Sequence, residues 1–399
     1  MHIPSTTLLY LGLTFGLLVV PRALQRFRIP AQLTCFVFGI LAAVFLKQLV
    51  GDPVSRVVAT FGIASLFLLA GMEVDFVAIR KCLPRLSAHL AIRILFLSFV
   101  TWLAVQYWHL GWQPAVLLAL GLLTPSTGFI LDALPTSHLT VEEQGEVSLN
   151  AIAGEVTALM VLFVVLQAGS VVSLAVSSAI LIGLVVLTPF LFLFLGKYVT
   201  PYAPGSEFSL LLMVGILCAA LTQNLGVHYL IGAFVAGLVA SLLRKRMAAL
   251  ASEENLHAVA LFASFFVPFY FFYEGLEVPP NSLVWRSLFS GLMLVLVVIP
   301  IRVAVIWLQA RFLSRHTVRG SFRVSVALMP TLIFTLVIAE VLRERFHIGD
   351  GLYGSLLMYA TVTTMLPSFL LPNLCEPVGA VATGGIGIGV KVDGGIGEV

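Results

Sequence analysis

Charged residues are scarce in this chain of 399 residues. Lysine and arginine together number 22, aspartate and glutamate number 19, and charged side chains make up 10% of the sequence, against about 25% in an ordinary soluble domain. So few charges cannot cover the surface of a soluble fold in which 60% of the residues are hydrophobic. The net charge of +3 also leaves no large basic surface, so we expect no nucleic-acid partner.

Cysteine is rare as well, and the four cysteines have no metal-ligand or redox spacing. This argues against a disulfide-stapled secreted domain. The sequence also lacks a His/Asp/Ser set, a metal-ligand cluster and a phosphate-binding glycine loop near one membrane face. We therefore expect a protein that is not an enzyme and that has no cofactor.

Long hydrophobic runs dominate the chain instead. A membrane-spanning helix needs roughly 20 apolar residues, and thirteen runs of about this length are bounded by charges, proline or glycine. They predict an all-α polytopic membrane protein whose main partner is the lipid bilayer. The predicted spans are 4–20, 30–49, 54–71, 86–108, 112–134, 146–168, 170–196, 207–225, 227–243, 256–276, 284–310, 322–342 and 351–373.

Basic residues in the loops predict the orientation. Fifteen lysines and arginines fall in one alternating set of loops and five in the other, and the basic side faces the cytoplasm. We expect a multi-pass protein of the cell (inner) membrane with its N-terminus outside and its C-terminus in the cytoplasm. Residues 1–373 form the predicted transmembrane domain. Residues 374–399 are rich in glycine and predict a flexible tail, with no attached nucleotide-binding domain.

Two opposite charges fall near the middle of the predicted membrane region. Glu155 lies nine residues beyond Glu146, and Arg302 lies nine residues before Arg311, which places both about 13 Å from the cytoplasmic ends of their spans. An ionisable group in hydrocarbon costs several kcal/mol and indicates a functional site by default. The pair predicts either a transport site or a fixed structural ion pair.

Two spans are interrupted at a similar depth. Pro125 breaks the fifth span and Pro330 breaks the twelfth, both about 10 Å from the cytoplasmic side. The spans run in opposite directions, so the breaks are able to cross and form an ion site, although each is also explained by a simple proline kink. The hydroxyls of Thr124, Ser126 and Thr127 are candidate ligands in the first break, which ends at Gly128.

Arg93 is a third charged residue at this depth, about 12 Å into the fourth span. It is either a second charge partner for Glu155 or a side chain that extends toward the cytoplasm. If both arginines face the site, they outnumber its one carboxylate, which would weaken cation binding.

Three motifs resemble the monovalent cation:proton antiporter family of the Kef and sodium/proton exchanger type. The most specific is Ile231-Gly-Ala-Phe-Val-Ala-Gly-Leu238, which is similar to the family's GAFxAGL run. Ala70-Gly-Met-Glu-Val-Asp75 resembles its AGLExD segment, and 266–276 resembles its P-x-F-F-x-x-x-G-L segment. The resemblance covers residues 5–373.

The resemblance implies a sodium/proton antiporter-like fold with inverted repeats and two crossed discontinuous helices. It also implies a homodimer in which core helices and dimerisation helices are interleaved along the chain. Glu155 matches the acid that binds the monovalent cation or the proton in the family, and Arg302 matches a basic residue of the eleventh span. Gly154 departs from the family pattern, which has Asp or Asn there, and predicts a vacancy beside Glu155.

These features predict exchange of Na⁺ or K⁺ for protons by alternating access. With Glu155 as the only exchanging group, one proton moves per cation and the cycle is electroneutral. Two alternatives stay open, namely a channel-like or sensory membrane domain of the same fold, and a transporter for an anionic or organic solute.

Overall fold

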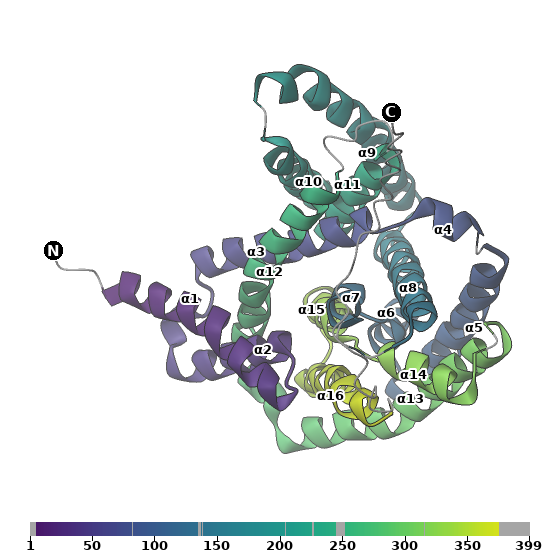
Figure 1. Cartoon of the computed structure of the whole chain (residues 1–399). Helices are drawn as coiled ribbons and strands as arrows, with labels where there is room; N and C mark the ends of the chain where they lie inside the picture. Colours follow the sequence, from purple (N-terminus) through teal and green to yellow (C-terminus); the bar gives the residue numbers. More distant parts are fainter. Residues whose placement is uncertain are drawn as a thin grey trace, which may run out of the picture.

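The computed structural model describes residues 5–81, 83–134, 137, 139–203, 205–225, 227–244, 252–314 and 316–374. This part of the chain is α-helical, with a few short 3₁₀ turns and no β-strand within the described ranges. Residues 375–399 of the predicted tail lie outside the described residues. The helices are α1 (Ser5–Leu24), α2 (Ala31–Phe45), α3 (Pro53–Met72), α4 (Phe76–Lys81), α5 (Leu83–Trp108), α6 (Trp112–Leu123), α7 (Thr127–Ala133), α8 (Val141–Gln167), α9 (Val171–Tyr198), α10 (Glu207–Asn224), α11 (Tyr229–Leu243), α12 (Glu253–Leu276), α13 (Trp285–Phe312), α14 (Val318–Ala327), α15 (Leu332–Phe346) and α16 (Asp350–Leu374) (Figure 1).

The structure does not confirm the number of membrane spans that the sequence predicts. Ten helical segments in the described part of the chain are long and apolar enough to cross a membrane, or eleven if α14 and α15, bent by 44°, count as one. The count of thirteen is therefore not confirmed. The two remaining predicted segments are α2 and α11, which have 15 residues each and reach only about 22 Å, less than the hydrocarbon thickness of about 30 Å.

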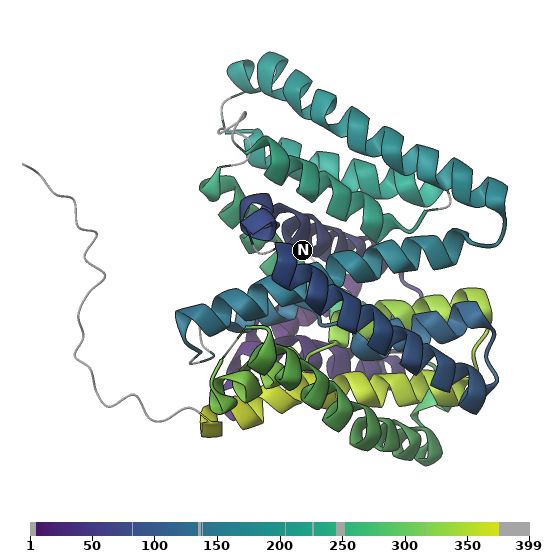
Figure 2. The ribbon, with the colours of Figure 1, turned by 90° about the vertical axis from the view of Figure 1, so that its right-hand side faces the viewer.

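The helices pack in two groups. In the first, α3 contacts α10, α11 and α12, and α12 also contacts α2. In the second, α6 contacts α5, α8, α15 and α16, while α13 contacts α14 and α16. Figure 1 shows α6, α7 and α15 close together inside this second group, and Figure 2 shows the long helices running side by side. The division into core helices and dimerisation helices that the resemblance implies remains a prediction.

Glycines allow the helices of the first group to touch through their backbones. A Cβ added at Gly237 on α11 would overlap the carbonyl oxygen of Leu68 on α3, and one at Gly71 on α3 would overlap that of Phe234. A Cβ at Gly232 would overlap the carbonyl of Cys218 on α10. Small residues at such contacts let membrane helices approach closely. The glycines of the sequence motif 231–238 therefore have a packing role.

We expect Gly237→Leu to destabilise the protein severely, because the new side chain forces α11 away from α3. The loss should appear as aggregated or degraded protein in detergent size-exclusion profiles. Gly183→Leu on α9, where a Cβ meets nothing within 4 Å, should behave like the wild type. A monodisperse Gly237→Leu protein with an unchanged melting temperature would contradict this packing role.

The helix that carries Glu155 has a firmly defined beginning. Thr140 caps α8 by accepting the backbone N–H of Glu143, and the side chain of Glu143 accepts the N–H of Thr140 in return, which forms a capping box. Glu143 also forms an ion pair of 2.6 Å with Arg323 on α14. The start of α8 is thus fixed to the helix that leads into the second break.

Candidate functional site

The two interrupted helices meet at their breaks. The first break separates α6 from α7, and the second separates α14 from α15. The backbone N–H of Ser126 in the first donates to the carbonyl of Pro330 in the second, at 2.8 Å. The crossing of the breaks at Pro125 and Pro330 that the sequence predicts is confirmed, and neither break is a simple kink.

Side chains of each broken helix satisfy backbone groups of the other. The hydroxyl of Ser126 accepts the N–H groups of Ile333 (3.0 Å) and Phe334 (3.4 Å) at the start of α15. Thr335 donates to the carbonyl of Gly121 on α6 at 2.7 Å. Inside a membrane, backbone groups must find such partners within the protein. The hydroxyl of Ser126 thus organises the crossing, and its role as an ion ligand stays a prediction.

Arg302 binds the carbonyl ends of the two breaks. Its guanidinium, on α13 and 2% exposed, donates to the carbonyls of Leu328 (2.8 Å), Met329 (3.1 Å) and Leu122 (3.3 Å). The carbonyl of Leu122 lies in the last turn of α6, and those of Leu328 and Met329 directly follow α14. The helix dipoles place partial negative charge at these C-terminal ends. Tyr359 on α16 also donates to the carbonyl of Leu122, at 2.7 Å. Arg302 therefore holds the C-terminal ends of α6 and α14 together at the crossing.

Glu155 lies at the opposite, N-terminal end of a half-helix. It is 5% exposed, and its Oε2 accepts the backbone N–H of Thr127, the first residue of α7, at 3.2 Å. The partial positive charge at this end of α7 favours a carboxylate. The hydroxyl of Thr127 is buried and has no hydrogen-bond partner within the described ranges. Glu155 and Thr127 are thus brought together as the sequence suggests.

The expected pairing of Glu155 with the arginines is not seen. Among the described residues, Glu155 makes no ion pair with Arg302 or Arg93, and both guanidinium groups bind backbone carbonyls instead. Their role as charge partners of Glu155 stays a prediction. Thr124 is 3% exposed and remains a candidate ligand that the geometry does not assign. Gly128 lets α7 approach α3, because a Cβ there would press on Leu66.

A second carboxylate was not among the expected site residues. Glu73 ends α3, is partly buried, and lies near enough to Glu155 to interact with it electrostatically. The sequence contained a signal, because Glu73 stands within the motif 70–75. Its proximity to Glu155 depends on how α3 packs against α7, which neither helix reveals alone.

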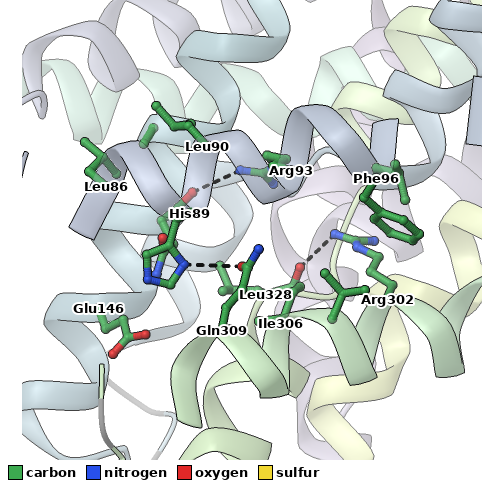
Figure 3. A pocket seen from close by; sticks show the side chains of 14 residues that line it. Leu86, His89, Leu90, Arg93, Phe96, Glu146, Arg302, Ile306, Gln309 and Leu328 are labelled. Atoms are coloured by element: carbon green, nitrogen blue, oxygen red, sulfur yellow. Dashed lines mark hydrogen bonds between the residues drawn. The ribbon is translucent and has the colours of Figure 1, made fainter. Parts of the chain in front are cut away.

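The predicted vacancy beside Gly154 is filled. Arg93, on α5, points at α8, and a Cβ at position 154 would overlap its Nη1. The same nitrogen donates to the carbonyl of Asn150 at 3.4 Å (Figure 3). The expectation of a vacancy there is therefore wrong. The missing side chain at 154 makes room for a guanidinium that comes from another helix.

Comparison with known proteins now settles the family. The profile described as "Sodium/hydrogen exchanger, transmembrane" matches residues 12–376. The chain belongs to the sodium/hydrogen exchanger family. It is thus a multi-pass membrane protein in a family of monovalent cation:proton antiporters, which are transporters.

Individual relatives resemble this chain over most of their length. The chain is 24% identical over 369 residues to a probable Na(+)/H(+) antiporter 3 of Methanocaldococcus jannaschii, covering 89% of this chain and 93% of that protein. It is 23% identical over 371 residues to a Na(+)/H(+) antiporter of Enterococcus hirae, covering 89% and 94%. Its fold is similar to that of the sodium proton antiporter MjNhaP1 from M. jannaschii at pH 8, with a TM-score of 0.67, 14% identity, and coverage of 91% and 95%.

Proposed function

We propose that this protein is a secondary transporter that exchanges a monovalent cation, Na⁺ or K⁺, for protons by alternating access. The observation that carries the proposal is the buried carboxylate of Glu155, held by the N–H of Thr127 beside two crossed half-helices. Relatives described as Na(+)/H(+) antiporters support it. No enzymatic activity is proposed.

The chemistry follows from competition at one carboxylate. Glu155 binds either a proton or a cation, so loading one releases the other. The buried hydroxyl of Thr127 supplies a further oxygen atom, which suits hard alkali cations. Thr124 and Ser126 are secondary candidates. Arginine does not release its proton at physiological pH, so Arg302 stays a fixed part of the crossing.

The membrane setting is part of the same proposal. The excess of basic residues in one set of loops supports a cytoplasmic C-terminus, an external N-terminus and a location in the inner membrane. A homodimer is the assembly that the family resemblance implies. Exposed apolar side chains along α9, including Val186, Leu187 and Phe190, are compatible with lipid or with a second copy.

The test of this function is proton flux in proteoliposomes. With an internal pH dye and the membrane potential clamped, pulses of sodium, potassium or lithium should each be compared with choline. We expect a pH change with at least one alkali cation, and a rate that does not depend on the clamped potential if one proton moves per cation.

The other outcomes separate the alternatives. Cation flux without coupled proton movement would indicate a channel-like domain, and no flux with folded protein would indicate a sensory one. Flux that depends on the anion and not on the cation would indicate an anionic solute. A rate that changes with potential would retain antiport but contradict the one-to-one stoichiometry.

A further inference from the structure

A large polar cavity lies where α12 and α15 end. It has a volume of about 400 Å³, and residues of α3, α10, α11, α12 and α15 line it. Its walls therefore come from the first group of helices and from α15, the half-helix that follows the second break. In the proposed orientation of the chain, this end of the helices faces the outside.

Two poorly exposed carboxylates line this cavity. Glu274 on α12 is 7% exposed, and Glu340 on α15 is half-buried. The two are close enough to interact electrostatically, and neither forms an ion pair with a described residue. Two neighbouring carboxylates with little access to bulk water repel each other. A cation beside them therefore stabilises both.

A buried hydroxyl accompanies Glu274. Tyr270 precedes it by four residues on α12, which places both on one face of the helix, and both line the cavity. Tyr270 is 2% exposed, and its hydroxyl has no hydrogen-bond partner within the described ranges. A phenol both donates a hydrogen bond and accepts one. Carboxylate and phenol oxygens thus gather on one wall of the cavity.

The basic residues that line the cavity are the exposed ones. Arg56, near the start of α3, and Arg345, near the end of α15, are both exposed, as is the carboxylate of Glu344. None of the three forms an ion pair with a described residue, and water and salt screen charges at such positions. With His228 neutral, three carboxylates face two arginines. The remaining negative charge belongs to the less exposed carboxylates.

A third arginine near Glu340 is engaged elsewhere. Arg343 interacts with Glu340 electrostatically, but its guanidinium donates to the carbonyl of Glu277 at 3.0 Å and lies over the ring of Tyr353. It does not line the cavity. Arg343 therefore weakens the field of Glu340 without occupying the space beside it.

The cavity extends toward the predicted ion site. Ile63 on α3 lines it, and Leu66, one turn further along α3, packs against Gly128 on α7. The first N–H of α7 binds Glu155. Glu340 lies eight residues after the start of α15, about 12 Å from the second break. The cavity thus lies between the crossing and the outer end of the helices.

We propose that this cavity is an outer binding site for a hydrated monovalent cation, held between the carboxylates of Glu274 and Glu340 on its way to or from Glu155. The site deepens the proposed exchange and rests on it for the movement of the ion. A water molecule takes up about 30 Å³ in the liquid, so the cation keeps much of its water and exchanges rapidly. Among the described residues, no group of three His, Cys, Asp or Glu side chains is arranged to hold a metal ion, which disfavours a tightly coordinated divalent cation.

The first test measures binding in Glu155→Gln, in which the inner carboxylate is absent. Its melting temperature should rise by a few degrees in sodium or potassium chloride relative to N-methylglucamine chloride at equal ionic strength, because a ligand that binds only the folded state stabilises it. Adding Glu274→Gln should remove most of this rise. Adding Glu344→Gln, which removes an exposed carboxylate of the same cavity, should keep it.

Three outcomes of this test would overturn the proposal. The first is the absence of a rise in Glu155→Gln, and the second is an equal rise, or an equal loss, in the two double variants. The third is a rise that calcium produces and no alkali cation produces. None of these outcomes depends on transport, so they are distinct from a failure of the exchange assay.

The second test compares the two sides of the membrane. In right-side-out vesicles, Glu274→Gln should raise the KM for the external cation about fivefold or more, with kcat at saturating cation close to that of the wild type. In inverted vesicles the KM should not change. An unchanged KM on both sides, or an equal increase on both, would overturn the outer site.

A structural measurement covers the case in which the variants fail to fold. Thallium(I) is a monovalent cation that scatters X-rays anomalously. Crystals of the wild-type protein soaked in thallium(I) acetate should show an anomalous peak between Glu274 and Glu340. Peaks only at other positions would overturn the proposal.

Discussion

Glu155→Gln should reduce cation-coupled proton flux to the level of empty liposomes. Glutamine keeps the size of the side chain and can still accept the N–H of Thr127, which Glu155 accepts at 3.2 Å, but it neither carries a charge nor exchanges a proton. A cation then has no carboxylate to bind, and residue 155 has no proton to release. The measurement is the initial rate of internal pH change after a pulse of the cation that the wild type transports.

The variant should remain folded, because replacing a buried carboxylate with an amide removes a charge from hydrocarbon. Its melting temperature should equal or exceed that of the wild type. Glu142→Gln is the matched control, since Glu142 is exposed in the first turn of the same helix, and its flux should be normal. Persistent exchange in Glu155→Gln would move the site to another group, with Glu73 the first to examine.

Arg302→Met should cause the largest loss of stability among arginine variants. Methionine fits the apolar surroundings, but it leaves the carbonyls of Leu328 and Met329 without the donors that they have at 2.8 and 3.1 Å. The carbonyl of Leu122 loses the bond from Arg302 and keeps the one from Tyr359. An unsatisfied buried polar group costs about 1–3 kcal/mol. We expect a large drop in melting temperature in detergent and loss of transport.

Two further variants test whether the loss of stability in Arg302→Met comes from the lost hydrogen bonds. Arg302→Lys keeps the charge but replaces a planar fork with a single ammonium, so its stability should be intermediate. Arg311→Met changes an arginine near the exposed end of the same helix, which contacts the carbonyl of His316 at 3.1 Å, and should cost little. If Arg302→Met and Arg311→Met melt at the same temperature, Arg302 does not lock the crossing.

The sequence predicted the crossing because its causes are local. Proline at 125 and 330 removes a backbone donor at each position, and depth counting placed both breaks at the same level of the membrane. The hydrogen bond between Ser126 and Pro330 confirms that inference. Burial of Glu155 was predictable because it too has a local cause. The distance of Glu155 from the end of α8 follows from helix geometry.

The direction of long side chains was not predictable in this way. The sequence predicted one depth for Arg302 and Arg93, but depth does not distinguish a carboxylate from a carbonyl as a partner. Whether an arginine binds a carboxylate or a carbonyl depends on the rotation of α13 and α5 about their axes. It also depends on the free carbonyls that the breaks create. The proximity of Glu73 to Glu155 likewise arises only when α3 packs against the second group of helices.

The overlap between Arg93 and position 154 couples the two positions. A Cβ at 154 would meet the guanidinium of Arg93 where it now lies. The guanidinium is the far end of a flexible side chain, so a larger residue at 154 is accommodated when Arg93 turns away from α8. The identity of residue 154 therefore sets the conformation of Arg93, and the two positions are best varied together.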